Sequence, residues 1–206
     1  WRSFTHWIGG MGVLVFVMAV LPLAGGTNMY MMKAESPGPS VSKLVPKVQS
    51  TAKILYTIYI ILTIVEIIFL LIGKMPLFDT LCLRFGTAGT GGFGIKNDSI
   101  ASYSTYNQVV ITVFMILFGI NFNAYYLLLT KKVMQAAKNE EVRYYLGIIG
   151  LAIVAIAINT REMFTSFGSA FQQAAFQVGS IITTTGYATT DFNVWPVFSK
   201  TILVIL

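Results

Sequence analysis

Two short segments of the chain, 94 residues apart, end in the same kind of loop. The first loop is Gly89-Thr90-Gly91-Gly92-Phe93 and the second is Thr183-Thr184-Thr185-Gly186-Tyr187. Setting Gly92 over Gly186 also pairs a threonine two residues earlier and an aromatic residue one position later, which indicates an internal repeat. Each segment is too short to cross a bilayer. Non-helical backbone at membrane depth must be buried in protein or line a wet cavity, so these loops strongly restrict the possible folds.

Long apolar runs indicate that the chain lies in a membrane. Residues 54–72 and 109–130 are each long enough to span the hydrocarbon core. Only 11% of the residues are charged, against about 25% in soluble domains. The net charge of +6 is read as a signal of membrane orientation and not of nucleic-acid binding. Membrane lipid is therefore an expected partner, and nucleic acid is not.

The basic residues predict the topology. The segment 25–53 carries four lysines against one acid, and the segment 132–145 is also rich in basic residues. Both are expected to be cytoplasmic loops. Two full spans then separate them, so residues 73–107 must dip into the membrane from the outer side and return.

The expected fold is an all-α membrane protein made of repeats, each with a helix, a short pore helix, a filter loop and a closing helix, as in potassium channels. Residues 1–24 are expected to be the closing helix of an earlier repeat. The second repeat, 54–131, is expected to be complete, with helices over 54–72 and 108–130, a pore helix over 78–86 and the filter over 89–93.

The third repeat, 146–206, is expected to be truncated. Its predicted parts are a helix over 146–158, a pore helix over 167–182, the filter over 183–187 and a helix that starts at 195. The chain begins without methionine and ends inside an apolar run, so we expect it to be a piece of a longer polypeptide.

The glycine-rich loops are suited to binding a cation through their backbone. Glycine adopts positive φ without a Cβ clash, and rings of carbonyl oxygens can replace the hydration shell of a monovalent cation. Neither loop contains an acidic residue. Threonine can add hydroxyl or carbonyl oxygens, and Phe93 and Tyr187 are expected to pack behind the loops as struts.

Three other classes of protein are alternatives to a cation-conducting protein of this kind. A secondary transporter built from broken helices would place an organic or anionic substrate at the N-termini of half-helices. Here the half-helices run toward the loops with their C-terminal ends, which carry partial negative charge and favour a cation. A membrane enzyme needs clustered catalytic groups, whereas the chain has one histidine and one cysteine. A tetrameric channel of identical chains would need identical filters, and these two differ.

Three acids have two interpretations each. Glu66 lies inside an apolar run, where a charged carboxylate costs about 2.5–3.5 kcal/mol. It is either a carboxylate of the pore vestibule or of a helix pair, or a structural hydrogen-bonding group. Asp98 and Asp191 follow the two loops and either raise the local cation concentration or are ordinary solvated loop acids. The single histidine, His6, is expected to make an interfacial polar contact.

The chain resembles the Trk/Ktr/HKT superfamily of potassium transporters, in its bacterial TrkH/TrkG branch. The resemblance rests on the two Thr-x-Gly-aromatic loops after half-helices and on three further motifs: Trp7-Ile8-Gly9-Gly10-Met11-Gly12, Lys33…Ser36-Pro37-Gly38-Pro39 and Gly119-Ile120-Asn121-Phe122. It implies four repeats around one pore, potassium uptake across the inner membrane by a multi-pass protein, a homodimer, and a cytoplasmic nucleotide-binding regulator of the TrkA type. It implies no organic cofactor and no enzymatic activity.

The resemblance also assigns the site. It implies a potassium filter made of Thr90, Gly91, Gly92 and Phe93 from the second repeat and of Thr184, Thr185, Gly186 and Tyr187 from the third. Potassium itself is expected at Thr90, Gly91, Thr184 and Thr185. The first-repeat filter, the fourth repeat and the glycine-rich gate of the third closing helix fall outside this sequence, and coupling to protons or sodium stays open.

Overall fold

The computed structural model describes residues 1–12, 48–129 and 139–206. Within these ranges every regular element is helical, which confirms the expected all-α fold. Residues 13–24 of the predicted helix over 1–24, and residues 25–47 and 132–138 of the two predicted cytoplasmic loops, lie outside the described residues. The elements are α1 (Arg2–Gly9), α4 (Val48–Ile72), α5 (Leu77–Ala88), α6 (Thr105–Phe118), α7 (Phe122–Leu129), α9 (Glu140–Asn159), η1 (Arg161–Met163), α10 (Phe167–Ile182), η2 (Phe192–Val194) and α11 (Val197–Ile205).

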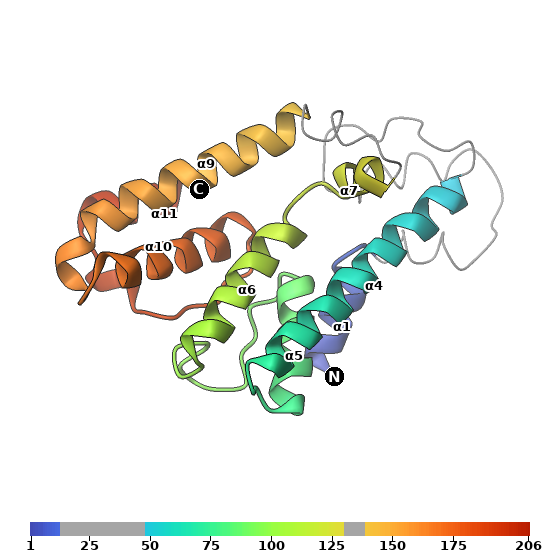
Figure 1. The fold of residues 1–206 in the computed structure, drawn as a ribbon, viewed down its shortest axis with the longest axis horizontal. Helices are drawn as coiled ribbons and strands as arrows, with labels where there is room; N and C mark the ends of the chain where they lie inside the picture. Colours follow the sequence, from blue (N-terminus) through green and yellow to red (C-terminus); the bar gives the residue numbers. More distant parts are fainter. Residues whose placement is uncertain (13–47, 130–138) are drawn as a thin grey trace.

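The helices form two groups that meet at α6 and α10 (Figure 1). The first group contains α4, α5 and α6, with α1 packed on α5. The second contains α9, α10 and α11, drawn in orange and red. Each group has the order long helix, shorter helix, loop, helix, and the shorter helices α5 and α10 lead into the two glycine-containing loops.

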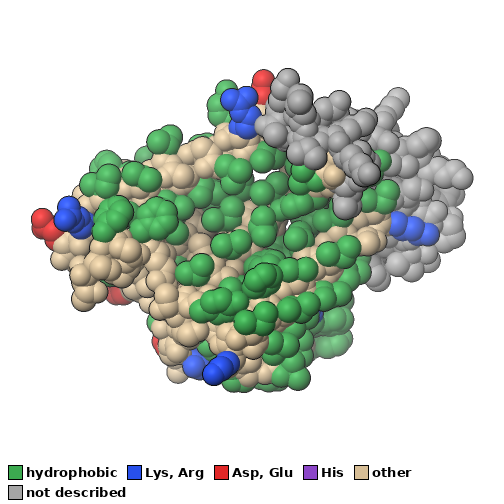
Figure 2. Space-filling view, in the orientation of Figure 1, with side chains coloured by type: hydrophobic (Ala, Val, Ile, Leu, Met, Phe, Trp, Pro, Cys, Tyr) green, Lys and Arg blue, Asp and Glu red, His purple; other side chains and the backbone are tan. Residues whose placement is uncertain are grey.

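Two helices are long and apolar enough to cross a membrane, Ala52–Ile72 and Glu140–Asn159. In the space-filling view, apolar side chains cover most of the described face, and charged side chains lie near its margins (Figure 2). Both helices begin earlier than the apolar pattern predicts, so residues 48–53 and 140–145 are helical and the two predicted loops are shorter. A helix continues past its apolar part where no proline interrupts it, and Asn139 caps α9 by accepting a hydrogen bond from Glu141 N at 3.1 Å.

The two pore helices have defined ends. α5 has 12 residues, about 18 Å in length, and so cannot span the roughly 30 Å hydrocarbon core. It starts after Pro76, its N-cap residue, and ends at Gly89. α10 starts with a capping box in which the side chains of Ser166 and Ser169 bond each other's backbone. Such a box satisfies N–H groups that a helix start leaves unpaired.

The second repeat differs from prediction in its closing helix. One continuous helix was expected over 108–130, but α6 ends at Phe118 and α7 begins at Phe122. Gly119 and Asn121 lie in the break. In a continuous helix, the carbonyl groups at positions 116 and 117 would bond residues 120 and 121; here side chains from elsewhere reach them.

Two tyrosines stabilise this break. The hydroxyl of Tyr145 in α9 donates to the carbonyl oxygen of Ile116 at 3.1 Å. The hydroxyl of Tyr125 in α7 donates to the carbonyl oxygen of Leu117 at 2.7 Å. Because Tyr145 belongs to the following repeat, the shape of α6 depends on contacts that a local apolar pattern does not report.

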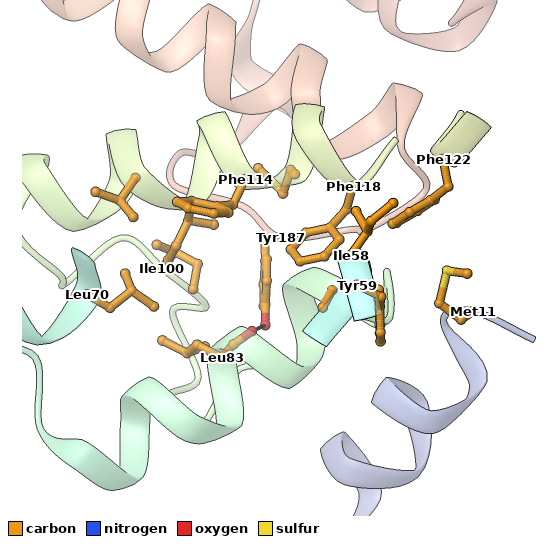
Figure 3. Close-up of a cluster of buried hydrophobic side chains, with 14 of the residues drawn as sticks. Met11, Ile58, Tyr59, Leu70, Leu83, Ile100, Phe114, Phe118, Phe122 and Tyr187 are labelled. Carbon is orange, nitrogen blue, oxygen red and sulfur yellow. Dashed lines mark hydrogen bonds between the residues drawn. The ribbon is translucent and has the colours of Figure 1, made fainter. Parts of the chain in front are cut away.

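The buried side chains form two clusters that do not follow the repeat boundaries. One cluster centres on α4, α5 and α6, yet it includes Phe176 and Tyr187 from the third repeat. The close-up shows Tyr187 between Phe114 and Leu83, inside the second repeat (Figure 3). The other cluster joins α9, α10 and α11. The side chain of Tyr187, the last residue of the second loop, is therefore part of the core of the neighbouring repeat.

Candidate functional site

The two loops have the same backbone conformation at paired positions. Thr90 and Thr184 have φ of +50° and +57°, and Gly92 and Gly186 have φ of +62° and +85°. The residues between them do not have positive φ. These positive φ values depart from the regular dihedrals of a helix or a strand. A threonine at positive φ is strained, so finding it twice at one offset supports a functional role.

The hydrogen bonds that lead into the loops also repeat. Gly91 N donates to Gly86 O at 2.7 Å, and the paired bond runs from Thr185 N to Ser180 O at 2.9 Å. One position earlier, each loop threonine donates its N–H to the carbonyl three residues before it, at 3.2 Å in the first loop and 2.9 Å in the second. These bonds occupy the backbone N–H groups on the helix side of each loop. The loop geometry thus follows from how each pore helix ends.

The two loops lie side by side. A Cβ atom built on Gly92 would collide with the carbonyl oxygen of Thr185 and would lie 3.1 Å from the carbonyl carbon of Gly186. A Cβ on Gly186 would meet nothing within 4 Å in the described chain. Glycine is therefore required at position 92 by its neighbour, and positive φ favours glycine at both positions.

A cavity of about 390 Å³ lies against the threonine end of both loops. The C-terminal residues of the two pore helices, Ala88 and Ile182, are part of its wall. Helix C-termini carry partial negative charge, so this arrangement favours a cation in the cavity. The other lining residues come from the two loops, from the end of α1 and the residues after it, and from the break between α6 and α7. They are Gly9, Gly10, Gly12, Thr90, Phe118, Gly119, Phe122, Thr183 and Thr184.

Tyr187 holds the second loop against the helices of the second repeat. Its side chain is 1% exposed, and its hydroxyl donates to the carbonyl oxygen of Leu83 in α5 at 2.9 Å. The ring carbon Cζ lies 3.2 Å from the place where a Cβ on Gly86 would be, so a glycine in α5 makes room for this contact. Ser180 Oγ donates to the carbonyl oxygen of Tyr187 at 2.6 Å. The loop is thereby held on both sides.

Phe93 is the residue of the first loop that pairs with Tyr187, and it packs on α1. The guanidinium carbon of Arg2 lies 4.0 Å from the centre of its ring, and the ring of His6 lies 4.8 Å away, edge to face. His6 therefore contacts the aromatic residue of the first loop, and its expected interfacial polar contact stays a prediction. Tyr187 packs on α5, so each loop aromatic packs against a helix that lies earlier in the chain.

Hydrogen bonds join the residue after the second loop, Ala188, to the segment between the first loop and α6, which is called the outer loop below. Ile100 N donates to Ala188 O at 3.1 Å, and Ala188 N donates to Ser99 Oγ at 3.2 Å. Gln108 Nε2 lies within 3.3 Å of three carbonyl oxygens of this outer loop, and its Oε1 accepts from Gln172 in α10 at 2.9 Å.

The same outer loop is anchored to the start of α5. Tyr103 donates to Asp79 Oδ2 at 2.8 Å. Burial and the nearby Asp79 carboxylate raise the pKa of the Tyr103 phenol, which therefore stays protonated and donating at neutral pH.

None of the three acids considered from sequence lines the cavity beside the loops. Glu66 is fully buried and does not line the cavity. It interacts with Thr87 and with the charge of Arg84 in α5, although neither carboxylate oxygen has a well-formed hydrogen bond within the described chain. This supports the helix-pairing interpretation over a pore-vestibule carboxylate. Asp191 accepts two hydrogen bonds from Asn193 and caps η2, and Asp98 is exposed.

Several residues that shape the site have no strong sequence signal. Gly86, Ser99 and Gln108 act through partners far away in the chain. Tyr59 and Tyr145 lie in apolar runs and look like ordinary span residues. Gly119 and Asn121, inside the predicted span 108–130, form the local pattern that could have indicated the break.

Comparisons with known proteins agree with this geometry. A family model described as TrkH, a cation transport protein, matches residues 1–152. The Trk system potassium uptake protein TrkH of Vibrio parahaemolyticus is 35% identical over 211 residues, which cover 98% of this chain and 43% of the relative. The Escherichia coli K12 protein TrkG is 33% identical and is matched over 95% of this chain and 41% of its own length.

A solved structure gives the same result. The crystal structure of the potassium transporter TrkH from Vibrio parahaemolyticus matches with a TM-score of 0.78 and 30% identity, over 99% of this chain and 42% of that one. The chain thus spans less than half the length of the relatives that it matches. Within that span it belongs to the TrkH family of cation transport proteins, which are membrane proteins.

Proposed function

We propose that the complete protein takes up potassium across the inner membrane, as a multi-pass transport protein and not as an enzyme. The observation that carries this proposal is the pairing of the two loops, which repeat their φ pattern and meet where Gly92 faces Thr185. Carbonyl oxygens that point toward one axis can replace the water around a potassium ion. The relatives named as potassium uptake proteins support this choice of ion.

The residues proposed to hold potassium are Thr90, Gly91, Thr184 and Thr185, with Gly92, Phe93, Gly186 and Tyr187 completing the filter. Their backbone supplies the ligands, so no organic cofactor is needed. Thr184 and Gly186 are exposed in this chain, in keeping with further filter loops from the remaining repeats of the same polypeptide. We also propose a homodimer and a cytoplasmic nucleotide-binding regulator of the TrkA type, as the family resemblance implies.

The substitution Gly186→Ser in the complete transporter tests this function. A Cβ at this position meets nothing within 4 Å, so the change acts mainly through the positive φ of +85°, where a side chain adds about 1–3 kcal/mol of strain. We expect the preference for potassium over sodium, measured by rubidium uptake with competing sodium, to fall roughly tenfold.

Gly147→Ser is the matched control, because a Cβ at Gly147 in α9 also meets nothing within 4 Å. It should leave the preference as in the wild type. An unchanged preference in Gly186→Ser, at normal amounts of protein in the membrane, would remove the filter assignment.

A further inference from the structure

One contact between neighbouring repeats occurs twice. Tyr59 in α4 donates its hydroxyl to the carbonyl oxygen of Trp7 at 2.8 Å. Tyr145 in α9 donates to the carbonyl oxygen of Ile116 at 3.1 Å. Each tyrosine comes from the first helix of one repeat, and each acceptor lies in the closing helix of the repeat before it. The two tyrosines also lie at similar depth, 13 residues before the end of α4 and 14 before the end of α9.

The same tyrosines lie over equivalent glycines, three residues after each acceptor. A Cβ on Gly10 would be 2.5 Å from the hydroxyl of Tyr59. A Cβ on Gly119 would collide with the hydroxyl of Tyr145 and lie 3.1 Å from its Cζ. Both glycines are at the points where α1 and α6 end, so each tyrosine lies over the C-terminal end of the helix that supplies its acceptor.

Each of these glycines also touches the end of the next pore helix. A Cβ on Gly10 would lie 2.9 Å from Cα of Gly89, and a Cβ on Gly119 would lie 2.9 Å from Cγ2 of Thr183. Gly89 and Thr183 are paired in the 94-residue repeat. The three partners therefore recur together at both repeat boundaries: a tyrosine, a closing-helix glycine and the first residue after a pore helix.

The contact is close to the filter. Thr183 Oγ1 lies 2.8 Å from Thr185 Oγ1, and Thr185 is one of the filter residues proposed to hold potassium. Gly10, Gly119 and Thr183 all line the cavity beneath the loops. A shift of the backbone at the end of α6 would therefore move both the wall of the cavity and Thr183, the first residue of the second loop.

We propose that Tyr59 and Tyr145 are positioning residues for the filter, each locking the closing-helix break of the preceding repeat against the base of its own filter loop. This inference rests on the proposed function. It assigns to each repeat boundary a clasp, defined as the tyrosine, the closing-helix glycine and the first residue after the pore helix. Through the clasp, ion preference depends on hydroxyl groups that do not contact the ion.

The second clasp allows a test by rescue. In the complete transporter, Gly119→Ala places a methyl group on the Tyr145 hydroxyl, and the atoms in its way are side-chain atoms only. We expect the potassium-over-sodium preference to fall about tenfold. Adding Tyr145→Phe removes the colliding oxygen and should restore part of that preference, up to the level of Tyr145→Phe alone.

Tyr125→Phe is the matched control for the rescue, because its hydroxyl bonds the adjacent carbonyl of Leu117 without lying over Gly119. Combined with Gly119→Ala it should restore nothing. Equal rescue by both phenylalanines, or a normal preference in Gly119→Ala itself, would overturn the proposal. A merely structural role would lower the amount of protein in the membrane and leave the preference unchanged, which also overturns it.

The first clasp predicts the opposite outcome for rescue. Gly10→Ala meets the carbonyl oxygen of Ala88 at 2.8 Å and Cα of Gly89 at 2.9 Å, and these backbone atoms cannot move aside. Tyr59→Phe should therefore fail to rescue it, and rescue there would contradict the clasp geometry.

Two further measurements keep the result interpretable. If Gly119→Ala does not reach the membrane, Tyr145→Phe alone is compared with Tyr125→Phe; a several-fold larger loss of preference in Tyr145→Phe supports the clasp, and equal values overturn it. Wild-type uptake is measured in parallel. A wild type that fails to take up potassium removes the proposed function, whereas an active wild type with unaffected variants removes only the clasp.

Discussion

The hydroxyl of Tyr187 donates a hydrogen bond of 2.9 Å to the carbonyl oxygen of Leu83, although the two residues are 104 positions apart. This bond joins the second loop, residues 183–187, to α5, which leads into the first loop. Tyr187→Phe removes it while keeping the ring, and such a bond contributes about 0.5–1.5 kcal/mol. We expect a several-fold lower preference for potassium over sodium in rubidium uptake.

Tyr103→Phe is the control for this prediction. It also removes one tyrosine hydrogen bond, to Asp79 at 2.8 Å, but that bond lies outside the filter. It should lower thermal stability slightly and leave ion preference unchanged. Equal effects of the two substitutions on preference would show that the Tyr187 hydroxyl has no special role.

Gly86 makes room for the same hydroxyl. A Cβ on Gly86 would collide with Tyr187 Oη and lie 3.2 Å from Cζ, so Gly86→Ala should strongly reduce uptake. Tyr187→Phe should recover part of it. Gly179→Ala in α10 is the matched control, because its nearest atom is Ile116 Cγ1 at an ordinary 3.5 Å and alanine favours a helix by about 1 kcal/mol. A loss of uptake in Gly179→Ala as large as in Gly86→Ala would contradict this explanation.

Gln108 joins the outer loop to α10. Its side chain is 6% exposed and bonds three loop carbonyls and Gln172. Gln108→Met leaves these buried groups without that partner and should destabilise the fold by about 1–3 kcal/mol, seen as a lower Tm of the purified protein. Gln172→Met breaks only one of these bonds and should cost less. The reverse order would show that the loop is held by other contacts.

Glu66 and Arg84 are expected to act as a pair. Both are buried and attract each other electrostatically. Arg84→Met alone removes a positive charge that favours the ionised form of the buried Glu66 carboxyl, and it should lower the thermal stability. Adding Glu66→Gln should recover much of that loss in a thermal unfolding measurement. Simple addition of the two effects would mean that the charges do not interact.

Much of this architecture could be predicted from local sequence. The 94-residue offset between the loops could be recognised because both loops carry glycine and threonine at the same relative positions. The limits of α10 agree with the predicted 167–182, and those of α5, Leu77–Ala88, lie close to the predicted 78–86. Proline and serine at their starts are short-range signals.

Local patterns are sufficient to predict that the chain is helical and membrane-bound, and that two loops carry matched threonine, glycine and aromatic residues. These properties depend on hydropathy and on backbone preferences of single residues. Three features became evident only from the three-dimensional arrangement: where α6 breaks, which repeat Tyr187 packs into, and that Tyr59 and Tyr145 lie over the glycines at the ends of α1 and α6. The physical reason is that each of these features needs a hydroxyl or a carbonyl supplied by a neighbouring repeat, which a local pattern cannot contain.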